Sequence, residues 1–132
     1  MTQFVTDTHP LIWYSQSLPK KLGRRARRAF EKAEAGQAVV YVPTMVLVES
    51  LELVRSGLVN LTLLPDDWIA ALFDTGGFVE ADLTTDVILA AHELYAIPER
   101  ADRLIAATAR SLGLPLITRD QTIAAAGVDV VW

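Results

Sequence analysis

Short apolar runs rich in β-branched residues alternate along the chain with longer segments of helical period, and this alternation constrains the fold most. The runs that we expect to be strands are residues 4–6, 38–42, 78–81, 116–118 and 128–131. No hairpin turn signal joins any two of them, so helical crossovers must connect the strands. The pattern predicts an α/β fold with three layers, α/β/α, around a mostly parallel central sheet of about four to five strands.

The helical segments differ in how deeply their side chains are expected to lie. The basic segment 20–32 has an apolar stripe on one face only, which is typical of a surface helix. The segment 45–55 is apolar almost all round and predicts a buried helix, yet it contains Glu49. The helix over 102–112 is expected to bury Leu112. Residues 84–86 are expected to cap a further helix. The side chains of that helix that we expect to point inward are Val87, Ile88, Ala91, Leu94 and Tyr95.

Length and composition narrow the class of protein. At 132 residues the chain can bury a full core, so we expect a single domain over 1–132. No apolar run approaches the roughly 20 residues of a membrane span, and the first residues lack a signal-peptide pattern. A cytoplasmic protein without a membrane partner is therefore expected. Because the chain has no cysteine, thiolate metal sites and cysteine nucleophiles are excluded, and oxygen or imidazole must hold any metal.

The charge is unevenly distributed. The net charge of −4 argues against a simple electrostatic grip on nucleic acid. Seven of the twelve basic residues nevertheless fall within thirteen positions: Lys20, Lys21, Arg24, Arg25, Arg27, Arg28 and Lys32. Such a cluster is usually the solvated face of a helix, and the alternative is a contact with phosphate groups or an acidic partner.

Four acidic residues stand where a parallel sheet would place a ligand site. Asp7 and Asp120 each follow an expected strand, Asp102 lies in the first turn of a helix, and Glu49 lies inside the apolar segment. Because ligands bind beyond the carboxyl ends of parallel strands, the four side chains can converge on one cleft. Carboxylates so close together repel, and a divalent cation removes the repulsion. With oxygen donors alone, the expected ion is Mg²⁺ or Mn²⁺, which commonly serves phosphoryl chemistry.

Other residues of chemical interest have ordinary explanations beside the functional ones. Asp102 can simply favour the helix dipole, and Asp7 and Asp120 can be loop residues. Glu49 is the hardest to explain as a solvated side chain. The histidines and tryptophans, which we expect to be structural, core or interface residues rather than ligands or base-stacking platforms, are His9, His92, Trp13 and Trp68.

Four blocks of the sequence resemble the PIN-domain ribonucleases, and among them the VapC toxins of prokaryotic toxin–antitoxin pairs. The blocks are residues 5–13, residues 42–44 leading to Glu49, residues 101–109 and residues 116–120. By this resemblance, the residues that hold Mg²⁺ or Mn²⁺ are Asp7, Glu49, Asp102 and Asp120. Thr118 resembles the hydroxyl residue that supports the site, and Thr8 follows the first acid as in many relatives.

One pair of residues departs from the family pattern. Glu99 and Arg100 stand where the family often has Asp-Pro. Glu99 keeps a carboxylate that is longer by one carbon, and we treat it as a supporting residue. Arg100 replaces a rigid residue with a cation near the site. Metal spacing or substrate fit can therefore differ from that of the family.

The resemblance implies an endoribonuclease that hydrolyses RNA phosphodiesters with a metal-activated water. It further implies a homodimer and a VapB-like antitoxin whose tail blocks the cleft. The residues with an expected contact to RNA or antitoxin are Arg24, Arg25, Arg28 and Arg100. The main alternative is a non-catalytic PIN-like module that binds RNA or protein. A receiver or dehalogenase-like domain is disfavoured, because His9 and Arg119 stand where those domains need Asp and Lys.

Overall fold

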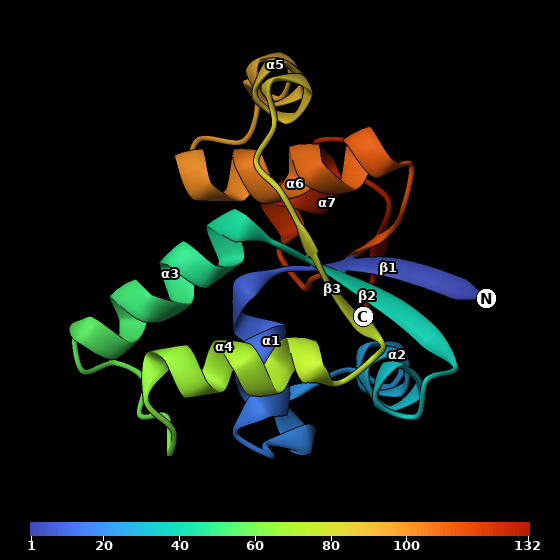
Figure 1. Ribbon diagram of the computed structural model, residues 1–132. Helices are drawn as coiled ribbons and strands as arrows, with labels where there is room; N and C mark the ends of the chain where they lie inside the picture. Colours follow the sequence, from blue (N-terminus) through green and yellow to red (C-terminus); the bar gives the residue numbers. More distant parts are fainter.

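Five parallel strands form one sheet in the order β3-β2-β1-β4-β5. The computed structural model describes residues 1–132, and Figure 1 shows the sheet between layers of helices. Its strands are β1 (Thr2–Thr6), β2 (Ala38–Pro43), β3 (Phe78–Ala81), β4 (Leu116–Ile117) and β5 (Val130–Val131). The three-layer α/β fold with a parallel sheet, expected from the alternation of segments, is confirmed.

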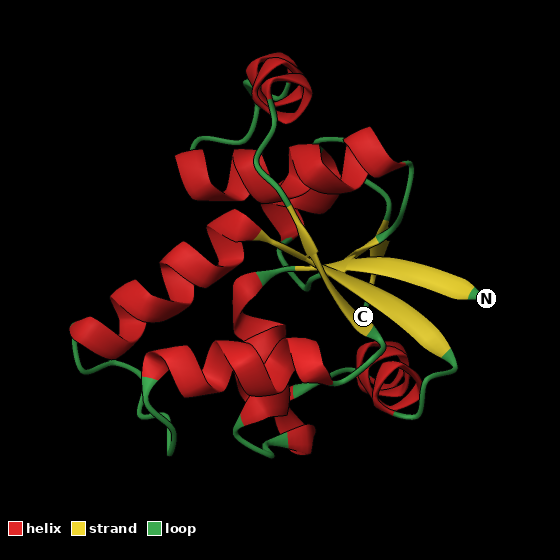
Figure 2. Cartoon of the chain, in the orientation of Figure 1, coloured by secondary structure: helices red, strands yellow, loops and turns green.

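Seven α-helices and one short 3₁₀ turn connect the strands (Figure 2). They are α1 (Thr8–Ser15), the 3₁₀ turn η1 (Pro19–Lys21), α2 (Arg24–Glu34), α3 (Thr44–Arg55), α4 (Pro65–Asp74), α5 (Thr85–Glu93), α6 (Arg100–Leu112) and α7 (Gln121–Ala125). In Figure 1, α1, α2 and α4 lie on one side of the sheet, and α5, α6 and α7 lie on the other. No helix is both long and apolar enough to cross a bilayer.

Strand β1 lies at the centre of the sheet, between β2 and β4. Val5 is fully buried and pairs with Tyr41 on one side and Leu116 on the other. The next residue, Thr6, pairs with Ile117 at the end of β4. Because this register aligns the two strand ends, the residues that follow them, Asp7 and Thr118, emerge side by side.

The basic surface helix is shorter than the sequence pattern suggests. Helix α2 begins at Arg24, with Gly23 at its N-cap, so Lys20 and Lys21 lie in the separate η1 turn. A Cβ on Gly23 would come within 2.5 Å of the Trp132 backbone and indole ring, so the lack of a side chain lets Trp132 pack here.

Three expectations about burial are wrong. Helix α3 is not buried all round, because it contacts mainly α1 and α6 beside the sheet, and Val48 is 51% exposed. Helix α5 packs mainly on α6, so one stripe of it is covered; Ile88 on this helix and Tyr95 just beyond it are exposed rather than inward. Leu112, the last residue of α6, is also exposed. These apolar side chains leave the domain with uncovered apolar surface on α3, α5 and the segment after α5.

Candidate metal centre

The candidate site lies where the order of the strands reverses. From β1 the chain adds β2 and β3 on one side, and it then returns to add β4 and β5 on the other side. In parallel sheets, ligands bind beyond the carboxyl ends of the strands at such a reversal. Asp7 follows β1, and Thr118 and Asp120 follow β4. Two of the four acidic residues predicted from the sequence therefore flank the reversal.

Asp7 is held by a hydrogen bond to each carboxylate oxygen. The backbone N–H of Thr8 donates to Oδ1 at 2.8 Å, and the Thr118 hydroxyl donates to Oδ2 at 2.7 Å. The Thr118 oxygen in turn accepts a hydrogen bond from the backbone N–H of Asp120 at 3.1 Å. Asp7 is only 9% exposed. These bonds join the ends of β1 and β4 and set the direction of the Asp7 carboxylate.

Glu49 reaches the same place from α3. Its Oε1 accepts a hydrogen bond from the Thr8 hydroxyl at 2.6 Å. Thr8 therefore orients two acids, one through its backbone and one through its side chain. The sequence places Thr8 beside the first acid, but it does not reveal the contact with Glu49, which is 41 positions away.

Asp102, in the first turn of α6, completes a group of three acids. One carboxylate oxygen from each of Asp7, Glu49 and Asp102 lies within 4.8 Å of the other two. Asp120 is outside this group of three. Its Oδ1 instead accepts hydrogen bonds from the N–H groups of Thr122 and Ile123 at 2.8 and 3.2 Å, and so caps α7. Its charge still acts on Asp7 and Asp102.

Burial and mutual repulsion make ionisation of these acids costly. The pKa of Asp102 is raised to about 7, first by burial and then by the negative charges of Asp7, Asp120, Glu99 and Glu49. Burial is also the main reason why the pKa of Asp7 and that of Glu49 are raised, although hydrogen bonds from threonine hydroxyls oppose the rise. The cluster therefore carries an electrostatic cost that a bound cation would relieve.

The donor set fits a hard divalent cation. All the converging atoms are carboxylate oxygens, as Mg²⁺ and Mn²⁺ prefer, and no thiolate or imidazole belongs to the group of three. Two of the three carboxylates are oriented by the outer hydrogen bonds that commonly support metal ligands.

The remaining predicted residues lie around the cluster rather than in it. Glu99 occupies the N-cap position of α6, and its charge raises the pKa of both Glu49 and Asp102. Arg100 is exposed and lines a hollow together with Glu49 and Glu99. Three of the arginines predicted to contact RNA or antitoxin, Arg24, Arg25 and Arg28, are exposed on α2 and lie outside the acidic group.

Three residues that adjoin the cluster were not predicted to belong to the site. A hollow of about 330 Å³ is lined by Asp7 and Asp120 together with His9, Trp13 and Arg119. Trp13 is therefore not a simple core residue. The available signal was positional: Trp13 lies on the helix that Asp7 caps, and Arg119 directly precedes Asp120.

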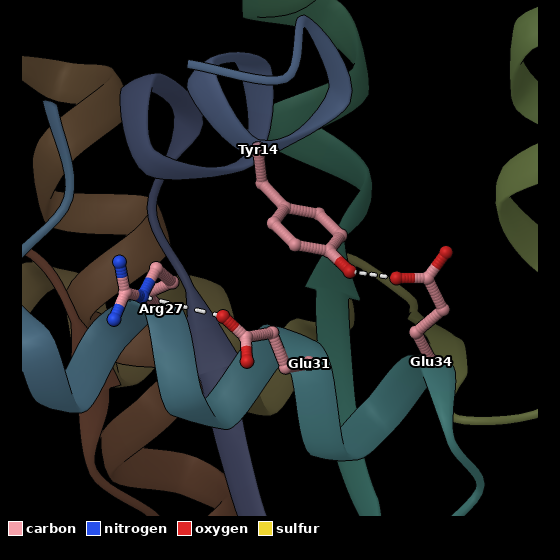
Figure 3. Close-up of polar contacts among 4 residues, drawn as sticks. All are labelled: Tyr14, Arg27, Glu31 and Glu34. Carbon is pink, nitrogen blue, oxygen red and sulfur yellow. Dashed lines mark hydrogen bonds and ion pairs between the residues drawn. The ribbon is translucent and has the colours of Figure 1, made fainter. Parts of the chain in front are cut away.

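A second, larger hollow, of about 400 Å³, lies among α1, α2, α4 and β3 and contains none of the predicted acids. Figure 3 shows that its charged groups pair with one another: the Tyr14 hydroxyl donates to the Glu34 carboxylate, and Arg27 forms an ion pair with Glu31 at 3.3 Å. Burial and the Glu34 carboxylate raise the pKa of Tyr14, so its hydroxyl stays protonated as the donor. The acidic cluster is the better candidate for chemistry.

Several solved structures share this architecture. VapBC2 from Rickettsia felis, bound to a DNA fragment from its promoter, is 14% identical, with a TM-score of 0.70 over 99% of this chain and 98% of that one. VapC20 from Mycobacterium tuberculosis, described as a sarcin–ricin loop cleaving toxin, is 18% identical, with a TM-score of 0.69 over 97% and 98%. FitAcB from Neisseria gonorrhoeae is 20% identical, with a TM-score of 0.61 over 98% and 96%.

These likenesses establish an α/β fold shared over the whole domain. No curated protein matches the chain by sequence. A family model described as the PIN domain does match, over residues 4–128. The chain therefore belongs to the PIN domain family, as the four sequence blocks predicted.

The stability of the metal-free protein should fall as the pH rises. The folded state keeps a proton on Asp102 up to about pH 7, whereas the unfolded chain releases it near the ordinary value of 3.8. The unfolded state thus binds fewer protons in between, and the free energy of unfolding decreases from about pH 4 to about pH 7. Urea denaturation in EDTA across this range measures the effect. Asp102→Asn should flatten the profile, and Asp129→Asn, an exposed acid just before β5, should not; identical profiles contradict the account.

The Thr118 hydroxyl should be needed for metal affinity. Thr118→Val removes the donor to Asp7 and is expected to weaken Mn²⁺ binding by about 10- to 100-fold, measured by electron paramagnetic resonance of free Mn²⁺. Thr118→Ser keeps a hydroxyl and should bind within a few-fold of the original protein. Thr108→Val, which removes a buried hydroxyl that bonds only within α6, controls for general loss of stability. Equal affinities for the Val and Ser variants would refute the role.

Proposed function

We propose that this protein is a Mg²⁺- or Mn²⁺-dependent endoribonuclease that acts as the toxin of a toxin–antitoxin pair. One observation carries the proposal: carboxylate oxygens of Asp7, Glu49 and Asp102 converge within 4.8 Å at the strand reversal of a PIN domain. Three carboxylates this close together repel one another unless a cation binds between them. The group is therefore better suited to holding a cation than to a role without one.

The residues at the acidic cluster have different proposed roles. Asp7, Glu49 and Asp102 would hold the cation, each through a carboxylate oxygen, while Thr8 and Thr118 keep two of these carboxylates oriented. Asp120 adds negative charge at the side of the hollow that it shares with Asp7. Glu99 contributes a further charge near Glu49 and Asp102. A bound Mg²⁺ or Mn²⁺ supplies the activation of a water and the stabilisation of charge on the phosphate oxygens.

A VapB-like antitoxin is the proposed protein partner. The structural neighbours from Rickettsia felis and Klebsiella pneumoniae are described as VapBC2 and as a toxin–antitoxin complex. The VapC20 neighbour is described as a sarcin–ricin loop cleaving toxin. We propose that the antitoxin covers the acidic cleft, as the resemblance of the sequence to the VapC toxins implies. The exposed cations proposed to contact RNA or antitoxin are Arg24, Arg25, Arg28 and Arg100.

A homodimer is the proposed assembly, and uncovered apolar side chains support it. Ile88 and Leu89 on α5 are 50% and 61% exposed, and Tyr95, just beyond the helix, is 85% exposed. Val48 on α3 is also exposed. Large apolar side chains gathered on one segment commonly mark a protein interface.

RNA cleavage should depend on both the metal and the acids. The purified protein is expected to cut cellular RNA in Mg²⁺ or Mn²⁺ and to lose this activity in EDTA. Asp7→Asn and Asp102→Asn should each abolish cleavage, because they remove a charge from the cation site. Gel analysis of the RNA measures activity, and circular dichroism checks that the variants are folded. Asp129→Asn is the matched control that should cleave normally.

Two results separate this proposal from a non-catalytic PIN module. Cleavage that persists in EDTA excludes metal-dependent hydrolysis. A folded protein that binds neither Mg²⁺ nor Mn²⁺ and leaves all RNA intact belongs instead to a binding or regulatory module. Sequencing the ends of RNA cut after brief expression identifies the substrate.

The exposed apolar surface of α5 should be required for self-association. Replacing Ile88 and Leu89 together by Asp is expected to convert a dimer of about 29 kDa into a 14.5 kDa monomer, because charges would have to be buried at the interface. Light scattering after size-exclusion chromatography measures the mass. The paired substitution of Leu63 and Leu64, which are exposed in the connection before α4, is the control. A monomeric starting protein would contradict the proposed assembly.

A further inference from the structure

The hollow beside the acidic cluster combines three kinds of side chain. Asp7 and Asp120 form its acidic wall, Trp13 and His9 supply aromatic rings, and Arg119 supplies a cation. Its volume of about 330 Å³ lies at the lower end of the range of roughly 300–1,000 Å³ for small-molecule sites. The hollow therefore accommodates a ligand about as large as one nucleotide.

Trp13 is the centre of a stack of rings and cations. The Arg119 guanidinium carbon lies 4.7 Å from the centre of its ring, and the Lys21 Nζ lies 5.6 Å from it. The His9 ring is 5.7 Å away and tilted, and the Trp132 ring approaches edge-on at 6.2 Å. Trp13 is only half-buried. The Trp13 indole is partly exposed, lies beside acidic residues and has two cations over its ring. The packing of the core does not require such an arrangement.

Arg119 has no acidic partner despite its position. The one ion pair of the molecule joins Arg27 to Glu31, so no carboxylate lies within ion-pair distance of Arg119. Its guanidinium rests instead on the rings of Trp13 and Trp132, the latter at 5.9 Å. Aromatic contacts hold a guanidinium plane in place without using its N–H donors. Those donors remain free for a phosphate or the edge of a base.

We propose that Trp13 and Arg119 form a nucleotide subsite that takes one unpaired nucleotide of the RNA next to the phosphodiester at the acidic cluster. This inference rests on the proposed ribonuclease function and names how its substrate is held. Unpaired bases are recognised by stacking on aromatic rings and on guanidinium planes, and the phosphate is met by a cation. Arg119 in the hollow and Lys21 over the Trp13 ring supply positive charge close to acids that alone would repel the RNA backbone.

Trp132 is a positioning residue in this arrangement. It contacts both Trp13 and Arg119, and the missing side chain of Gly23 makes room for it. Gly23→Ala would push Trp132 out of its place, because the new Cβ would lie 2.5 Å from it. RNA affinity should then fall by less than it does when Trp13 itself is removed.

Binding of single-stranded RNA tests the subsite separately from cleavage. The probe is a fluorescein-labelled pool of random eight-nucleotide oligoribonucleotides, titrated by anisotropy in Ca²⁺, with a gel to check that the RNA is intact. Trp13→Ala should weaken binding by about 5- to 150-fold, as expected for loss of one stacked base. Trp13→Phe keeps a ring and should restore most of the affinity.

Arg119→Gln should weaken binding and also change its salt dependence. Loss of one phosphate contact lowers the slope of log affinity against log salt by about 0.7 for a single strand. Arg110→Gln removes the same charge from the exposed end of α6 and is the matched control, for which affinity and slope should not change. The rise in melting temperature caused by Mn²⁺ should be equal in all these variants, which shows that the fold and the acidic cluster are intact.

The outcomes distinguish the subsite from the catalytic proposal. If the original protein does not bind the pool, binds a duplex of the same length equally well, or binds it no better than Trp13→Ala and Arg119→Gln, the subsite does not exist, whether or not RNA is cleaved. If the variants lose binding as expected but the original protein never cleaves RNA with Mg²⁺ or Mn²⁺, the subsite stands and the ribonuclease proposal fails.

Discussion

The hydrogen bond from Thr118 to Asp7 is the contact on which the site depends. It joins the two strand ends at the reversal of the sheet, at 2.7 Å, and it gives the buried Asp7 oxygen Oδ2 a donor. Without that donor, a buried acceptor would be left unpaired at a cost of about 1–3 kcal/mol. The cost could be avoided only by protonating or turning Asp7, and either change would disperse the group that Asp7 forms with Glu49 and Asp102.

The group of Asp7, Glu49 and Asp102 is more stable when partly protonated, whereas binding a cation requires its carboxylates to be ionised. Burial and the neighbouring acids raise the pKa of Asp102 to about 7, so near neutral pH the site lies between a protonated state and an ionised one. A cation resolves the conflict by favouring the ionised state. Arg119 lines the hollow that Asp7 and Asp120 share, lies over the Trp13 ring and forms no ion pair with an acid. Acidic and basic groups thus face one hollow without neutralising each other, which suits a polyanion that brings phosphate to a metal.

The sequence was sufficient for the architecture and pointed to the three acids that converge, but it placed Asp120 with them and did not reveal their surroundings. Alternating strand and helix signals imply parallel strands, but Asp7 and Thr118 meet because β1 and β4 are neighbours in a register that aligns their ends, and the sequence did not reveal that pairing. The bond from Thr8 to Glu49 depends on the rotation of α3, which no local pattern specifies. Val48 and Ile88 were expected to be buried but are exposed. An apolar helix in the sequence does not reveal whether its apolar side chains pack against this chain or against another one. Trp13 was interpreted as a core or interface residue because an aromatic residue gives the same sequence signal there and beside a site.

Calorimetric titration with Mn²⁺ at neutral pH tests the central claim, that these acids form a cation site, most directly. The account predicts saturable binding with release of protons, detected as a dependence of the heat on the ionisation enthalpy of the buffer, because Asp102 must lose its proton when the ion binds. Asp102→Asn should bind far more weakly and release few protons. Absence of saturable binding, or equal binding by the Asn variant, would contradict the account.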